Sequence, residues 1–118
     1  KKTKIKLNIK SRNFFISKFY EGIARFDFRE LCDANTGAED YIEIAKNCKF
    51  LVIDNIPKFN NENSDQQNRF ITLIDILYEK RIALLISISS NLENLGSSSK
   101  LKNSFRRTIS RLYELTAP

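Results

Sequence analysis

The sequence predicts a single α/β domain over residues 1–118, with an N-terminal antiparallel β-hairpin, a βαβ unit and a C-terminal helix. Two observations carry this prediction. Short apolar runs at 50–53 and 82–88 flank a long amphipathic segment, a pattern typical of two buried strands joined by a helix. Residues 4–10 alternate strictly between polar and apolar side chains, as a half-exposed strand does. A chain of 118 residues is long enough for one modest core.

The N-terminal hairpin is predicted from two β-rich stretches. Ile5, Leu7 and Ile9 share one face of the first strand, residues 11–13 form the turn, and residues 14–20 pair back. Lysines interleaved with aromatic rings are also found on platforms that bind single-stranded nucleic acid. A hairpin with one apolar and one solvated face is the favoured interpretation.

Helix starts are marked by Ser, Thr or Asp followed three residues later by Glu or Gln, the capping-box pattern. The pairs are Asp27 with Glu30, Thr36 with Glu39, and Ser64 with Gln67. A strand is expected over 23–28 before the first pair, and the helix after the second should end near Asn47. The helix after the third carries one apolar face that ends in a basic residue. That face holds Phe70, Leu73, Ile74, Leu77 and Arg81.

The remaining segments are predicted as loops and one last helix. The Asn-rich loop 55–63 and the Gly/Ser stretch 96–99 are expected to be flexible. The last helix has apolar residues at helical spacing and basic residues on its other faces. Its buried face is predicted to hold Leu101, Phe105, Thr108, Ile109, Leu112 and Leu115.

Charge and cysteine content narrow the function classes. The net charge of +6 divides into basic ends (1–29 and 81–118) and an acidic middle, which suits a phosphate-bearing partner or two solvated faces.

The absence of His removes the commonest general base and the Ser-His and Cys-His dyads. Two cysteines cannot build a four-ligand zinc site, so Cys32 and Cys48 are expected to be buried and reduced. No apolar run approaches the roughly 20 residues of a membrane helix.

Candidate nucleotide contacts are sparse. The chain has no G-x-x-x-x-G-K-[ST] phosphate loop, and its three glycines are scattered. Asp54 ends an apolar run, as a magnesium-binding Asp does in P-loop ATPases, and residues 89–91 follow the next run as a polar sensor would. A structural role is favoured for both. No catalytic residue and no metal ligand is predicted.

Three arginines are the candidates for contacts with a nucleotide or across an interface. Arg107 and Arg111 lie one helical turn apart and project together, a geometry suited to phosphate oxygens. A solvated basic face or a salt bridge to Glu114 is the alternative. Arg69 lies among apolar neighbours in the long helix with Asp75, where it would contact the nucleotide of a neighbouring subunit or pair with a carboxylate.

Several ordered motifs resemble the C-terminal half of ZapE-like (Afg/LACE-type) AAA+ P-loop ATPases, from about residue 5 to residue 115. The motifs are FDFRELC at 26–32, GAEDY at 37–41, NIP at 55–57, RFI at 69–71, LID at 73–75, LY at 77–78 and FRRTISRLYE at 105–114. Two positions depart from the family pattern: Leu115 stands where Met is usual, and Asn91 where Pro is common.

The resemblance implies a parent protein that hydrolyses ATP with Mg²⁺ and whose phosphate loop and acidic magnesium strand precede this region. It assigns Asp54 no place in that acidic motif. This chain would then be a C-terminal fragment, in agreement with the lack of Met at position 1, and would need no cofactor and have no ATPase activity alone. Its partner would be the N-terminal nucleotide-binding part of the same ATPase, in a possible homo-oligomer. The family is associated with bacterial cell division and with mitochondrial inner-membrane protein quality control, which places the chain in the cytoplasm or peripherally at the inner membrane.

Two alternatives come from other classes. A self-standing basic module would bind nucleic acid or a partner protein through its hairpin and last helix; nucleic acid is the less favoured partner in the preferred interpretation. A complete but degenerate P-loop fold is a second enzymatic interpretation.

Overall fold

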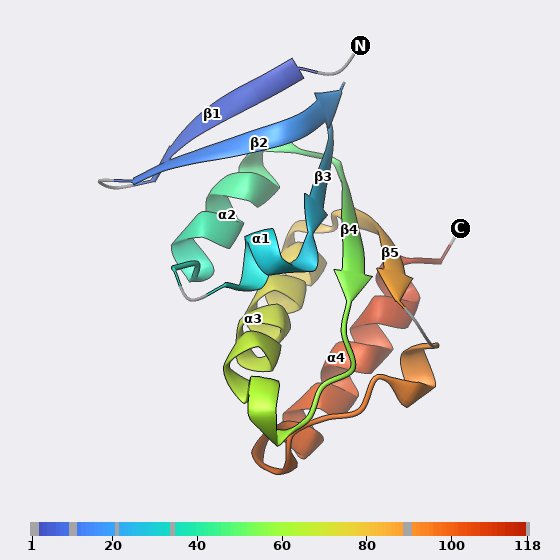
Figure 1. Ribbon diagram of the computed structural model, residues 1–118. Coiled ribbons are helices and arrows are strands. Elements are labelled where there is room, and N and C mark those ends of the chain that lie inside the picture. Colours follow the sequence, from blue (N-terminus) through green and yellow to red (C-terminus); the bar gives the residue numbers. More distant parts are fainter. Residues whose placement is uncertain (1–2, 10–11, 21, 34, 89–90, 118) are drawn as a thin grey trace.

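The computed structural model describes residues 3–9, 12–20, 22–33, 35–88 and 91–117, with side chains described from residue 22 onward. Five strands form one mixed sheet in the order β1-β2-β3-β4-β5 (Figure 1). The strands are β1 (Thr3–Ile9), β2 (Arg12–Tyr20), β3 (Ile23–Asp27), β4 (Phe50–Ile56) and β5 (Ala83–Ile88). Two predictions lie outside the described residues. They are the shared face of the Ile5, Leu7 and Ile9 side chains and the polar residues at 89–90.

The sheet has an antiparallel and a parallel part. β1 pairs antiparallel with β2, and β2 pairs antiparallel with β3. β3, β4 and β5 are parallel, with Ala24 opposite Leu51 and Leu51 opposite Leu84. β2 begins at Arg12, so Arg12 and Asn13, which were predicted to lie in the turn, belong to the strand.

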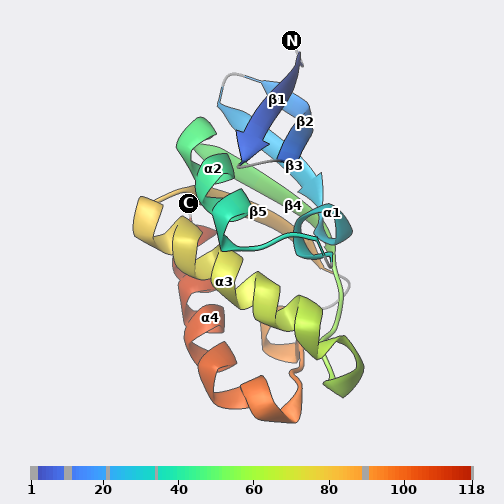
Figure 2. The same cartoon turned by 90° about the vertical axis from the view of Figure 1, so that its left-hand side faces the viewer.

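The predicted βαβ unit is confirmed as β4, α3 (Ser64–Lys80) and β5. A second parallel crossover, which the sequence analysis did not identify, runs from β3 through α1 (Phe28–Cys32) and α2 (Ala38–Asn47) to β4. The chain ends with α4 (Lys102–Leu115), as predicted. Figure 2 shows α3 and α4 on the same side of the strands.

One face of the parallel strands forms the core. The strand residues that face the helices are almost fully buried. They include Ala24, Phe26, Leu51, Ile53 and Leu84. From the helices, Phe70, Leu73, Ile74 and Leu77 of α3 have no exposed surface, and Phe105, Thr108 and Leu112 of α4 are buried. The predicted apolar faces are confirmed for these residues, whereas Leu101, Ile109 and Leu115 of the face predicted for the last helix are half-buried against the core.

The prediction that both strands of the βαβ unit are buried is wrong for one face of the sheet, where Phe50 and Val52 of β4 are half-buried and β5 is more exposed. Leu84 is 3% exposed, but Leu85 is 56% exposed, because the helices pack against the other face of β5 (Figure 2). An uninterrupted apolar run suggested burial on two faces. The strand has one buried face only.

The caps divide into one confirmed and two wrong predictions. Asp27 caps α1 by accepting a hydrogen bond from the Arg29 amide, and Glu30 accepts one from the Asp27 amide at 2.8 Å, as predicted. At α2 the cap is shifted by one residue: Asp40 accepts a hydrogen bond from the Gly37 amide at 2.7 Å. Thr36 instead donates its hydroxyl to a backbone carbonyl, so it does not cap the helix.

The capping box predicted at Ser64 and Gln67 is also wrong. Asn60 and Asn63 cap a 3₁₀ turn, η1 (Asn61–Asn63), which leads directly into α3, so Ser64 is already helical. Gln67 is fully buried and uses its amide on the loop before α4. Its nitrogen donates to the Ser97 hydroxyl at 2.8 Å, and its oxygen accepts from the Ser98 amide at 2.9 Å.

The two loops expected to be flexible are held by hydrogen bonds. In the loop 55–63, the Asn60 amide donates to the Asn63 side chain at 2.8 Å. Ser98, in the stretch 96–99, is 1% exposed. At the far end of α3, Arg81 has a left-handed φ of 59° and is the C-cap instead of the last residue of the apolar face.

Candidate functional site

Arg107 and Arg111 meet at one carboxylate between α3 and α4. The Arg111 Nη1 atom lies 2.5 Å from Asp75 Oδ1, and the Arg107 Nη2 atom lies 3.8 Å from Asp75 Oδ2. The first contact is a short charge-assisted hydrogen bond, and the second exceeds hydrogen-bonding distance. Asp75 is therefore the counter-ion, and the predicted alternative of a salt bridge to Glu114 is wrong for these two arginines.

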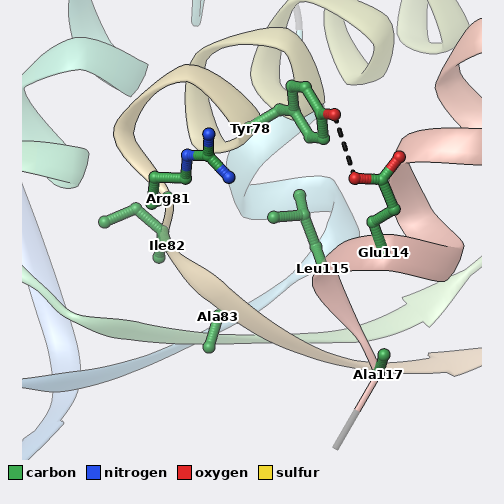
Figure 3. Close-up of a pocket in the computed structure, with 7 residues that line it drawn as sticks. All are labelled: Tyr78, Arg81, Ile82, Ala83, Glu114, Leu115 and Ala117. Atoms are coloured by element: carbon green, nitrogen blue, oxygen red, sulfur yellow. Dashed lines mark hydrogen bonds between the residues drawn. The ribbon is translucent and has the colours of Figure 1, made fainter.

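Arg111 is also held by an aromatic ring. Its guanidinium carbon lies 4.6 Å from the centre of the Tyr78 ring, within the range of a cation–π contact. The Tyr78 hydroxyl in turn donates to Glu114 Oε1 at 2.9 Å, shown by the dashed line in Figure 3. The Arg111 side chain is 24% exposed, against 61% for Arg107. This network fixes Arg111 between the helices and leaves most of the Arg107 side chain in solvent.

A small pocket opens beside this network, at the C-terminal ends of α3 and α4 and the start of β5 (Figure 3). It has a volume of about 240 Å³ and is lined by Tyr78, Arg81, Ile82, Ala83, Glu114, Leu115 and Ala117. One cation and one carboxylate face it, so its charges balance. The backbone amides of Arg81, Ile82 and Ala117 in this lining already donate to backbone carbonyls, so they are not available to bind a triphosphate.

The structure places Arg69 in a different neighbourhood. Its Nη1 atom lies 3.4 Å from the backbone carbonyl oxygen of Cys32, where α1 ends. Tyr41 also donates its hydroxyl to a backbone carbonyl of α1, that of Leu31. Arg69 thus helps to attach α1 to α3, and its contacts are separate from those of Arg107 and Arg111.

Both cysteines are free and buried, as predicted. Burial raises the pKa of Cys32 to about 12 and that of Cys48 to about 11. Neither thiol is poised for nucleophilic chemistry at neutral pH, because only the thiolate is a strong nucleophile.

Asp54 has a structural partner. Its carboxylate accepts two hydrogen bonds from Arg25 of β3, at 2.6 Å from Nε and 3.2 Å from Nη2. These hydrogen bonds raise the pKa of Arg25 above its ordinary value. The next residue, Asn55, has a left-handed φ of 63° and donates its side-chain amide to Asp27 at 2.7 Å. Asp54 thus forms a bidentate ion pair with Arg25 on the surface of the sheet.

Sequence reasoning missed Asp75 as the counter-ion and Arg25 as the partner of Asp54. Asp75 and Arg111 are 36 residues apart on different helices, so no local spacing links them. Arg25 and Asp54 lie on neighbouring strands whose parallel register only the sheet defines. A signal for the first was available: Asp75 is a charged residue among apolar neighbours in a helix, which requires a cationic partner.

Comparison with known proteins decides the family. The AFG1-like ATPase family matches over residues 1–118. The chain belongs to the AFG1-like ATPase family. The chain is 32% identical over 109 residues to lactation elevated protein 1 homolog B of Danio rerio, and the match covers 22% of that protein. It is 28% identical over 88 residues to cell division protein ZapE of Escherichia coli K12, and covers 24% of it.

These alignments take in 92% and 75% of the AFG1-like chain itself. Because the matches cover only 22% and 24% of the two relatives, the chain spans about a quarter of their length. No solved structure matches it. Within the described ranges, no helix is both long and apolar enough to cross a membrane.

Proposed function

We propose that this chain is the C-terminal part of a longer AAA+ ATPase, in which the preceding part binds ATP and Mg²⁺ and hydrolyses the nucleotide. The observation that carries the proposal is the family match over all 118 residues combined with coverage of only about a quarter of the relatives. The missing phosphate loop supports it, because a P-loop ATPase binds the triphosphate through that loop and its lysine. The cellular role proposed is in cell division or protein quality control, from the cytoplasm or the inner-membrane surface.

In this proposal the chain acts as a positioning domain. Its partner is the preceding nucleotide-binding part, and the assembled ATPase is a homo-oligomer. Arg107 is the best candidate for a contact across a domain or subunit boundary, because 61% of its side chain is exposed and its contact with Asp75 is long. Arg111 and Arg69 are weaker candidates for such a contact, since each is engaged in a contact between helices of this chain.

The isolated 118-residue chain is expected not to bind ATP. Backbone amides of a glycine loop and its lysine supply most phosphate contacts in P-loop proteins, and this sequence has neither. Calorimetric titration with Mg²⁺ and ATP should give only the heat of dilution. The complete polypeptide, titrated in the same way, is the positive control. Binding to the isolated chain in the micromolar range would contradict the proposal.

Substitution of the three C-terminal arginines by Lys in the complete ATPase should separate their roles. Arg111→Lys should lower the melting temperature, because a lysine cannot reproduce both the hydrogen bond to Asp75 and the contact with Tyr78. Arg107→Lys should leave the melting temperature nearly unchanged and lower the turnover number. Arg106→Lys is the matched control, since Arg106 is an exposed neighbour on the same helix.

The measurements are ATP turnover and thermal unfolding of the same three variants. Normal turnover in Arg107→Lys would remove this residue from the proposed interface. An Arg111→Lys variant that melts like the wild type would show that the contact with Asp75 contributes little, as many exposed ion pairs do.

A further inference from the structure

The sheet presents one face that the helices do not cover. On β3, β4 and β5 the residues of this face alternate with the buried ones. They form two rows across the three strands, Ile23, Phe50 and Ala83 and then Arg25, Val52 and Leu85, followed by the pair Asp27 and Asp54 on β3 and β4. Ile23 is 42% exposed and Leu85 is 56% exposed. We call Ile23, Phe50, Val52, Ala83 and Leu85 the open-face patch.

An uncovered face is unusual for parallel strands. Parallel sheets occur almost entirely with both faces buried, because the crossover connections place helices against them. Here α3 and α4 lie on one side of the strands, as Figures 1 and 2 show together. The five apolar residues of the open-face patch are neighbours across the strands. The side of the sheet away from the helices therefore carries a continuous apolar surface.

This face carries one ion pair and one further carboxylate, that of Asp27, which accepts hydrogen bonds from the Arg29 amide and the Asn55 side chain. Arg25 and Asp54 form a two-hydrogen-bond ion pair next to Val52. The contact surface of a covering element is therefore expected to be apolar at the patch and polar or basic toward the carboxyl ends of the strands, where Asp27 lies. An amphipathic helix has such a surface.

The size of the face distinguishes between possible occupants. Three strands spaced about 4.8 Å apart, each contributing about five residues with a rise of about 3.3 Å, give a face of about 240 Å². Stable protein complexes bury about 800 Å² on each partner, so two copies of this chain joined through this face alone would dissociate readily. A covalently connected segment has a high effective concentration and needs far less area.

We propose that the open-face patch is the docking site for an amphipathic helix of the polypeptide that precedes residue 1 in the complete protein. This inference rests on the proposed function, because it takes the chain to be part of a longer protein. The relatives support it: the residues matched here make up 22% and 24% of their lengths, so abundant chain is available to cover the face. The patch then joins the nucleotide-binding part to this domain through a shared core.

Thiol labelling tests the docking directly. Leu85→Cys places a reporter thiol in the patch, and Ile42→Cys, at a 38% exposed apolar position on α2, places a matched control outside it. The native Cys32 and Cys48 are buried, so they should react slowly with a maleimide. Each variant is labelled in the 118-residue chain and in the complete polypeptide, with the unsubstituted polypeptide as background.

The thiol at position 85 should react at least about 10-fold more slowly in the complete polypeptide, while the thiol at position 42 should react at similar rates in both forms. Equal rates at position 85 overturn the inference, as does equal slowing at both positions. Protection of position 85 in the 118-residue chain that increases with its concentration also overturns it, in favour of a second copy. If Leu85→Cys alters the melting curve, Val52→Cys is the second reporter.

Mg²⁺-dependent ATP hydrolysis is measured on the same samples of the complete polypeptide. Hydrolysis without protection at position 85 counts against the docking site alone. Protection without hydrolysis counts against the proposed function alone.

Discussion

Leu77→Ala should lower the free energy of unfolding by about 2–5 kcal/mol, the range for removing a buried Leu side chain without refilling the space. Leu77 has no exposed surface and lies on the apolar face of α3, within the hydrophobic core. Its backbone carbonyl also accepts the hydrogen bond from the Ile82 amide at 3.0 Å, where the chain turns into β5. A cavity here would loosen the helix and the strand start together.

A urea melt of the 118-residue chain measures this effect. Glu79→Ala is the matched control, because Glu79 is exposed on the same helix and its loss should change stability by less than about 0.5 kcal/mol. A Leu77→Ala variant that is as stable as the control would show that α3 is not packed against the sheet in solution.

Helical periodicity predicted the buried faces of α3 and α4 because one physical cause, burial of an apolar stripe, decides them. Helix starts were harder to predict because several polar residues compete for the same backbone amides. Before α3, the Asn63 side chain accepts a hydrogen bond from the Asn60 amide, and the Asn60 side chain accepts one from the Glu62 amide. These bonds cap a 3₁₀ turn that leads into α3, so Ser64 is already helical and does not cap the helix. The sequence contains both patterns, and only the packed structure selects one.

The candidate site shows the same limit. The sequence predicted that Arg107 and Arg111 project together, because i, i+4 geometry is local. It did not predict that Asp75 lies opposite them, because that depends on how α3 and α4 cross. The neutralisation of Arg111 by Asp75 changes its expected role from a phosphate ligand to a contact between helices.

Burial of β5 was overestimated for a related reason. A continuous apolar run predicts a strand but does not state how many of its faces are covered. Leu85 is an apolar residue of a type usually found in the core, but it is 56% exposed. The matched residues make up only 22% and 24% of two relatives, so the element that covers this face need not lie within these 118 residues.

Gly96→Ala should destabilise the chain by about 2–5 kcal/mol, the combined range for a left-handed backbone and an overpacked contact. Gly96 has a φ of 78°, and a Cβ atom added there would lie 2.6 Å from the backbone oxygen of Phe59. Gly96 and Phe59 form an isolated parallel bridge, and the Phe59 amide donates to the Leu95 carbonyl at 2.7 Å. The new methyl group can be accommodated only by moving this backbone.

Phe59 has little freedom to move. Its ring lies 5.4 to 5.7 Å, centre to centre, from the rings of Phe28, Phe70 and Phe105, which come from α1, α3 and α4. A shift of the Phe59 backbone would therefore disturb the contacts of three helices at once. This coupling explains why a one-carbon change in a loop should cost as much as a cavity in the core.

Gly37→Ala is the matched control for the Gly96 prediction. Gly37 precedes α2 with extended backbone angles, and a Cβ atom there would meet nothing within 4 Å. Its substitution should change the free energy of unfolding by less than about 1 kcal/mol. Urea melts of the two variants side by side measure the difference. Equal, small effects would mean that the bridge between Gly96 and Phe59 is not formed in solution, and that the stretch 96–99 is the flexible link that its Gly/Ser composition predicts.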